Sequence, residues 1–414
     1  MDEKLSGEEQ LLVLAKVLQA IPLYFAHWES SHIARGELEQ AFETLVKETL
    51  ACGNDRRRFS LLLMAFFARL NNGHTAFLDD HLEQNPPLGL ALRLLDEGWV
   101  VIASDLPGLR PGDLVRRLED KPVEEWYEAL YPYTVGSAQA RTAQFGEARG
   151  VLFPSLLTTF LPERFALTYA DAEGATHALA VDRAAPAGHA APPATVARRL
   201  DEHLAYIKIP SFLDPAFEAR AVAYVREYAE VPCLIVDVRG NGGGNTPGEL
   251  IRALMDRPYH WWKESLAFNA PMLTHRTLSD YAAGLGDSVQ LLRTSPPSRP
   301  SDEGYRGRLL ILVDRATWSA AEDFTMPFKD NGRATIIGET TGGSSGQPFM
   351  HAFDNGMAFA VGAKRQFLPD GAAFEGVGLA PDIAVTIRRQ DLYAGCDVAL
   401  ETAIGLAKAD PPGH

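Results

Sequence analysis

Apolar residues recur at helical spacing along the first 70 residues of the chain. One periodic run begins at Glu8, and a second spans residues 61–70. Residues 71–73, Asn-Asn-Gly, end helices and form turns, so His74 is expected on a loop just beyond a helix end. The pattern predicts a helical N-terminal region over residues 1–85 that carries the His74 loop.

The pattern then changes to short apolar runs separated by turn residues. Over residues 86–184 these runs predict a small, mainly β region, with Pro-Gly-Asp at 111–113 as one of its turns. The stretch that follows contains AAPAGHAAPPA, which is too poor in large apolar side chains to pack against a core. We therefore expect a linker at residues 185–203.

From residue 204 onward, continuously apolar strands alternate with helical segments. Such alternation predicts an α/β domain over residues 204–400, with central strands buried on both faces. Residues 259–306 interrupt the rhythm and are expected to be an insertion beside the sheet, and residues 401–414 a C-terminal tail. The expected elements, in order, are YIKIPSF, a helix over 215–228, CLIVDV, a helix after Thr246, LLILVD, a helix from Ser319, and TIIGE.

Length and charge limit the classes of function. A chain of 414 residues exceeds what one core usually organises, which predicts two or three domains. The 39 Lys and Arg against 54 Asp and Glu give a net charge of −15, which disfavours nucleic-acid or anionic-membrane partners. The basic run at 56–58 is interpreted as a solvated turn between helices. The acidic, amphipathic N-terminus and the absence of about 18 consecutive apolar residues predict a cytoplasmic protein without a membrane span.

No metal or cofactor motif is present in the sequence. The three cysteines, Cys52, Cys233 and Cys396, are widely separated and predicted to be reduced. HExxH, GxGxxG and GxxxxGK[ST] are all absent, so we expect neither a metal site nor a cofactor.

Two loops that follow predicted strands have unusual chemistry. DVRGNGGGN, residues 237–245, is rich in glycine, which lets backbone N–H groups converge on an anion. Ser319 lies at a strand-to-helix junction, where the following N–H groups also favour negative charge. Taken alone, Ser319 is equally well explained as a helix cap paired with Glu322. A lone histidine on a turn, such as His74, is by default a bystander.

Five motifs, in order, resemble the carboxyl-terminal processing (tail-specific) and tricorn-core family of serine peptidases. They are YIKIPSF, DVRGNGGG, TWSAAED, NGRATIIGETTGG and FEGVGLAPD, between residues 206 and 382. Upstream, NNGHT resembles the histidine loop of the family. PLGLALRL and LRPGDLVRRLEDKPVEEW are similar to its PDZ-like domain.

The resemblance implies a nucleophile at Ser319, with oxyanion donors at the backbone N–H groups of Ala320 and Gly243, and Gly242 as a further candidate. In the processing-protease branch a lysine stands 25 residues after the serine as the base. This chain has Ser344 at that position. The departure rules against a serine-lysine dyad and predicts that Ser344 is a dispensable loop residue.

The tricorn-like branch, which uses histidine and glutamate, fits the remaining residues better. His74 then acts as general base, and Glu375 in FEGVG orients it. The branch has a serine directly before its histidine, where this chain has Gly73, so the link between His74 and Glu375 stays open. Because a serine hydroxyl needs a neighbouring base to act as a nucleophile, three distant loops could supply such a triad.

The sequence therefore predicts an α/β protein with a crotonase-like catalytic domain, a PDZ-like β module and a helical N-terminal region. Its expected function is hydrolysis of peptide bonds through an acyl-enzyme on Ser319, with a peptide or unfolded protein as substrate; an oligomer is possible. Two alternatives stay open: a non-catalytic protein that binds peptides or hydrophobic ligands on the same scaffold, and a crotonase-type acyl-CoA enzyme.

Overall fold

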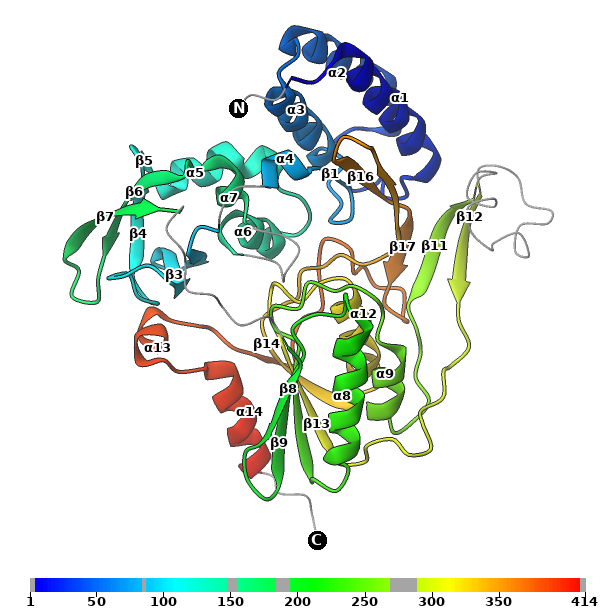
Figure 1. Cartoon of the computed structure of the whole chain (residues 1–414). Helices are drawn as coiled ribbons and strands as arrows, with labels where there is room; N and C mark the ends of the chain where they lie inside the picture. The colour runs from blue at the N-terminus through cyan, green and yellow to red at the C-terminus, as the bar shows by residue number, and fades with distance from the viewer. Residues whose placement is uncertain (1–3, 84–86, 148–154, 184–193, 269–288, 410–414) are drawn as a thin grey trace.

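Helices form the first part of the chain in the computed structural model, which describes residues 4–83, 87–147, 155–183, 194–268 and 289–409. They are α1 (Gly7–Tyr24), η1 (Arg35–Glu37), α2 (Leu38–Cys52) and α3 (Arg56–Ala68) (Figure 1). The Ser6 hydroxyl accepts the Glu9 N–H, and the Glu9 carboxylate accepts the Ser6 N–H, so α1 begins with a capping box. The predicted helices are confirmed, and His74 lies on the loop beyond α3.

The prediction of a solvated turn at residues 56–58 is wrong for Arg56. This residue opens α3 and is buried. Its guanidinium donates to both carboxylate oxygens of Asp79, at 2.7 and 3.2 Å, and to the Asn355 carbonyl at 2.7 Å. A buried cation needs such a paired and hydrogen-bonded environment. A charge run alone does not show which of its members has a partner far along the chain.

A small sheet joins the N-terminal helices to a distant part of the chain. β1 (Ala76–Asp79) pairs antiparallel with β16 (Met357–Gly362), which pairs in turn with β15 (Pro348–Ala352). The Phe67 ring lies 6.1 Å from Phe77 and 5.8 Å from Phe359, centroid to centroid, in the core shared by helices and sheet. The loop that carries His74 is thereby fixed between α3 and a paired strand.

Residues 90–182 contribute a second sheet with helices beside it. Its order is β2-β3-β4-β6-β7, with β5 paired to β4. Trp99 and Phe145 lie 4.4 Å apart in its core, which packs helix α6 against the sheet. The elements are α4 (Asp80–Glu83), β2 (Leu90–Leu95), β3 (Gly98–Ser104), β4 (Leu114–Leu118), β5 (Lys121–Pro122), α5 (Val123–Leu130), η2 (Tyr131–Tyr133), α6 (Ala138–Gly146), α7 (Leu156–Phe160), β6 (Arg164–Ala170) and β7 (Thr176–Asp182).

The largest α/β layer is a six-stranded sheet in the order β18-β14-β13-β10-β9-β8. All its pairings are parallel except that of β8 with β9. Helices α8, α9 and α12 lie on one face and α14 on the other (Figure 1). The elements are β8 (Val196–Arg199), β9 (Leu204–Lys208), α8 (Pro215–Glu227), β10 (Cys233–Asp237), α9 (Gly248–Leu254), β13 (Arg308–Val313), α12 (Ala320–Asp330), β14 (Ala334–Gly338), β18 (Ile383–Ala384), α13 (Arg389–Ala394) and α14 (Val398–Ala409).

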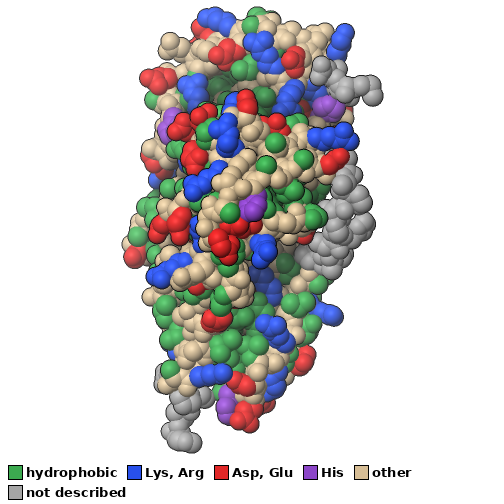
Figure 2. Space-filling view, turned by 90° about the vertical axis from the view of Figure 1, so that its left-hand side faces the viewer, with side chains coloured by type: hydrophobic (Ala, Val, Ile, Leu, Met, Phe, Trp, Pro, Cys, Tyr) green, Lys and Arg blue, Asp and Glu red, His purple; other side chains and the backbone are tan. Residues whose placement is uncertain are grey.

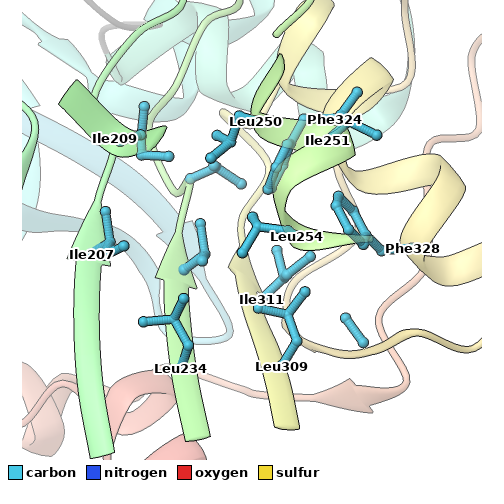
Figure 3. Packing of buried hydrophobic residues seen from close by; sticks show 14 of the residues in the cluster. Ile207, Ile209, Leu234, Leu250, Ile251, Leu254, Leu309, Ile311, Phe324 and Phe328 are labelled. Atoms are coloured by element: carbon cyan, nitrogen blue, oxygen red, sulfur yellow. The ribbon is translucent and has the colours of Figure 1, made fainter. Parts of the chain in front are cut away.

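Both faces of this sheet are buried, which explains its continuously apolar strands. Leu234 belongs to the cluster that includes Ile311 and Phe324, shown in Figure 3. Its neighbour Ile235 belongs to the cluster on the opposite face, with Leu400. Successive side chains of a strand point to opposite faces, so burial on both sides removes the polar alternation. A mixed α/β fold is thus confirmed.

Two boundaries differ from the sequence prediction. The expected linker at 185–203 contains strand β8, which forms an edge of the large sheet; residues 184–193 lie outside the described part. The expected tail from residue 401 continues helix α14 to Ala409, because Leu400 and Ala403 pack against the sheet. Their apolar spacing of three residues is the helical signal that was missed.

The predicted insertion at 259–306 is described at residues 259–268 and 289–306, which contribute strands to a three-stranded sheet separate from the large one. Its strands β11 (Lys263–Phe268) and β12 (Val289–Thr294) pair antiparallel, and β17 (Lys364–Phe367) adds to β11 as a third strand. Among the described residues, no helix combines the length and the apolar character that crossing a lipid bilayer requires.

Candidate active site

Four segments that are separate in sequence meet where their side chains form a row of hydrogen bonds. His74 Nε2 lies 2.9 Å from Ser319 Oγ, and His74 Nδ1 lies 2.8 Å from Ser344 Oγ. Ser344 Oγ donates to Glu375 Oε1 at 2.6 Å. The structure thus brings together His74, Ser319 and Glu375, the residues singled out from the sequence, and adds a fourth.

The prediction that Ser344 is a dispensable loop residue does not fit this geometry. For Ser319 to donate its proton to Nε2, His74 must carry its other ring proton on Nδ1 and donate it to Ser344 Oγ. Ser344 then donates to Glu375, so the four residues form one directional chain of hydrogen bonds. Ser344 supplies the link that the sequence left open, and no local sequence signal pointed to it.

Ser319 has the backbone geometry of a strained turn. It stands at the N-terminal end of α12 with φ 53° and ψ −120°, in a region that non-glycine residues rarely adopt. Its N–H donates to the Ser344 carbonyl and to Glu322 Oε2, both at 3.1 Å. Such strain costs of the order of 1–3 kcal/mol and persists only where the surroundings impose it. The Ser319 hydroxyl lies 2.9 Å from His74 Nε2 in this conformation.

Glu322 is the residue that imposes much of this geometry. Its fully buried carboxylate accepts from the Thr341 hydroxyl at 2.5 Å, the Gly343 N–H at 2.7 Å and the Ser344 N–H at 3.1 Å, besides the Ser319 N–H. Burial raises the pKa of Glu322 to about 8 against these hydrogen bonds. Sequence patterns identified this residue only as a helix-capping partner.

Asn72 holds the histidine and the glutamate in one frame. Its side-chain Nδ2 donates to Glu375 Oε1 at 2.7 Å, while its Oδ1 accepts the His74 N–H at 3.0 Å and the Thr75 hydroxyl at 2.9 Å. Burial raises the pKa of Glu375 to about 8, and its hydrogen bonds, that of Ser344 first among them, act in the opposite direction. In the sequence, Asn72 indicates only a turn.

The glycine loop approaches Ser319 closely, but the role predicted for the Gly243 N–H needs correction. That N–H donates to Asn241 Oδ1 at 2.9 Å and is therefore engaged within the loop. The N–H groups of Gly242 and Ala320 have no hydrogen-bond acceptor among the described residues. At Gly243, φ is +96°, and an added Cβ would lie 2.7 Å from Ser319 Cβ. Gly243 therefore permits close approach, and Gly242 and Ala320 keep the open donors.

Two lysines of the α/β region are each paired with a carboxylate away from Ser319. Lys329 pairs with Asp382 at 2.7 Å and Lys364 with Glu264 at 2.6 Å, so neither ammonium lies on Ser319. Within the residues that the structure describes, no group of His, Cys, Asp or Glu side chains could hold a metal ion.

In a comparison with known sequences, residues 203–385 match the model of peptidase family S41. The chain is 26% identical over 202 residues to a chloroplastic C-terminal processing peptidase of Tetradesmus obliquus, a match that covers 48% of this chain and 39% of that protein. It is 28% identical over 143 residues to a tail-specific protease of Haemophilus influenzae, covering 34% and 18% of the two chains. This chain therefore spans less than half of the length of either relative.

Comparison with solved structures extends the likeness to nearly the whole chain. The structure of mature CPAF complexed with lactacystin has a TM-score of 0.71 and 18% identity, with 97% of this chain and 98% of that chain covered. A second structure of mature CPAF gives 0.69 and 16%, with 98% of each chain covered. At this identity the likeness shows that the fold is shared.

Proposed function

We propose that this chain hydrolyses peptide bonds through an acyl-enzyme on Ser319, a proposal that the match of residues 203–385 to the model of peptidase family S41 supports. In this proposal His74 is the general base, Ser344 the relay and Glu375 the carboxylate that orients the imidazole. The observation that carries it is the unbroken chain of hydrogen bonds from Ser319 Oγ to Glu375 Oε1, with distances of 2.9, 2.8 and 2.6 Å.

The reaction follows from the direction of those hydrogen bonds. Ser319 Oγ attacks the carbonyl carbon of the scissile peptide bond while its proton passes to His74 Nε2. The imidazolium formed is stabilised through Ser344 by the Glu375 carboxylate, and it then gives the proton to the leaving amine nitrogen. A water molecule, deprotonated by His74, hydrolyses the resulting ester and releases Ser319.

The negative oxygen of the tetrahedral intermediate needs donors beside Ser319. We assign this role to the N–H groups of Ala320 and Gly242, because neither has an acceptor among the described residues. Ala320 follows Ser319 at the helix start, and Gly242 precedes Gly243, the residue of the glycine loop that approaches Ser319. The positive end of α12 adds to the same field.

The proposal extends to architecture and substrate. The large sheet β18-β14-β13-β10-β9-β8 with its helices would be a crotonase-like catalytic domain, and the sheet of β2 to β7 a PDZ-like module. The expected substrate is a peptide or an unfolded protein. On the face shown in Figure 2, Lys and Arg side chains are interspersed with Asp and Glu rather than gathered in one band, which is consistent with a partner other than nucleic acid.

A fluorophosphonate probe tests the proposed function directly. The folded protein should be labelled at Ser319, as located by peptide mass spectrometry, and should cleave a denatured protein substrate. Ser319→Ala should abolish both activities. Ser345→Ala is the matched control, because this buried hydroxyl in the same loop region bonds Asp323 rather than the relay. Absence of label on folded protein would favour a binding protein, and turnover of acyl-CoA without peptide cleavage would favour the crotonase-type alternative.

A further inference from the structure

The first turn of helix α6, outside the large sheet, contacts the loops that carry the relay. Gln139 Nε2 donates to the Thr341 carbonyl at 2.9 Å and to the Val377 carbonyl at 2.8 Å. Thr341 stands three residues before Ser344, and Val377 two residues after Glu375. One side-chain amide therefore joins the two loops whose hydroxyl and carboxylate meet at 2.6 Å.

Two neighbouring side chains extend the same contact. The buried Ser137 hydroxyl donates to the Gly342 carbonyl at 2.8 Å. Arg141 NH2 donates to Asn71 Oδ1 at 2.5 Å, directly before Asn72, which bonds Glu375. The segment from Ser137 to Arg141 thus binds the histidine loop, the relay-serine loop and the glutamate loop together.

Helix α6 packs tightly against the β2 to β7 sheet, which fixes the position of its first turn. Phe145 packs 4.4 Å from Trp99, centroid to centroid, and a Cβ added to Gly146 would lie 2.5 Å from the Leu92 carbonyl oxygen, so the helix lies directly on β2. Among the described residues, Gln139 supplies the only hydrogen bond to the carbonyls of Thr341 and Val377. The spacing of these loops therefore depends in part on a side chain of α6, a helix that packs on another sheet.

We propose that Gln139 is a positioning residue for the Ser344–Glu375 relay, and that α6 couples the β2 to β7 sheet to catalysis. This inference rests on the proposed function. A hydroxyl relay works only at hydrogen-bond distance, and a shift of about 1 Å in a catalytic group can cost a hundredfold in rate. Loss of Gln139 leaves other bonds between the loops, including Gly376 N–H to the Gly343 carbonyl at 2.8 Å, so a partial effect is expected.

The sharpest test is Gln139→Glu, which keeps the shape of the side chain and replaces its donor with an acceptor facing two carbonyls. We expect kcat on a short peptide and the rate of Ser319 labelling by a fluorophosphonate to fall about tenfold, with KM changed less than about twofold. Gln139→Ala should give a similar loss. Thr142→Ala is the control, because its hydroxyl bonds only carbonyls of α6 itself and the variant should match the parent.

The outcomes separate this inference from the proposed function. Parental labelling and kcat in folded Gln139→Glu would overturn the positioning role, as would a lower thermal stability with labelling of the folded protein unchanged. Full cleavage by Ser319→Ala would refute the proposed function itself, whatever Gln139→Glu does. Loss in Ser319→Ala together with the tenfold loss in Gln139→Glu supports both.

Discussion

Replacing Ser344 by Ala removes one oxygen atom from the middle of the relay. The His74 Nδ1–H then loses its acceptor at 2.8 Å, and Glu375 loses one of its donors, at 2.6 Å, while Asn72 still donates to it. Gly73 packs against Ser344, with an added Cβ expected 2.6 Å from Ser344 Oγ, so the site is tight around the missing atom. Ser344→Ala therefore separates the imidazole from the carboxylate.

The size of the effect follows from the charge that develops on His74. A hydrogen bond to a charged group is worth about 1.5–3 kcal/mol, and in the transition state the bonds on both sides of Ser344 become charge-assisted. Losing about 3 kcal/mol of transition-state stabilisation lowers kcat about a hundredfold. Because Ser344 does not contact substrate in this scheme, KM should change little.

The assay compares kcat, KM and thermal unfolding for the parent, Ser344→Ala and Ser345→Ala. The Ser345 hydroxyl bonds buried Asp323 at 2.9 Å, so its loss reports the cost of removing a buried hydroxyl from the same loop region without breaking the relay. If Ser344→Ala folds and its kcat is close to that of Ser345→Ala, the relay is refuted and Ser344 is only a loop residue.

Four further outcomes are expected. Because burial raises the pKa of Glu375 to about 8, its carboxylate form is lost below that pH, so kcat/KM should rise from pH 6 to 9; a pH profile that is identical in Glu375→Gln would contradict this. Because the folded state then holds this proton more tightly than the unfolded state, the free energy of unfolding should fall as the pH rises from about 4.5 to 8, which urea titration at a series of pH values measures. Gly243 has a φ of +96° and lies against Ser319, so Gly243→Val should lower both kcat and thermal stability. Parental turnover in this variant would show that the close approach of Gly243 to Ser319 is not needed for activity. Arg56→Ala leaves Asp79 buried and unpaired and should cost about 3–5 kcal/mol of stability; a change below about 1 kcal/mol would contradict the buried pair.

The sequence predicts the site residues that stand in recognisable motifs. It does not predict the residues that reach the site only through tertiary packing. Ser319, His74 and Glu375 stand in motifs, and the structure places them in one row. Ser344 and Gln139 act through a hydroxyl and an amide, which are common in any loop or helix. Their partners lie 31 to 270 residues away along the chain, so no local pattern could indicate them.

The sequence by itself determined the α/β class and the order of its elements. Continuous apolar strands such as β10 require burial on both faces, and glycine and serine at strand ends predict tight, polar loops, because these are properties of short segments. The tertiary structure decided which N–H groups stay open and which hydroxyl joins His74 to Glu375. A hydrogen bond depends on separations of a few tenths of an ångström between distant segments, and such separations are fixed only when the sheets, helices and loops pack together.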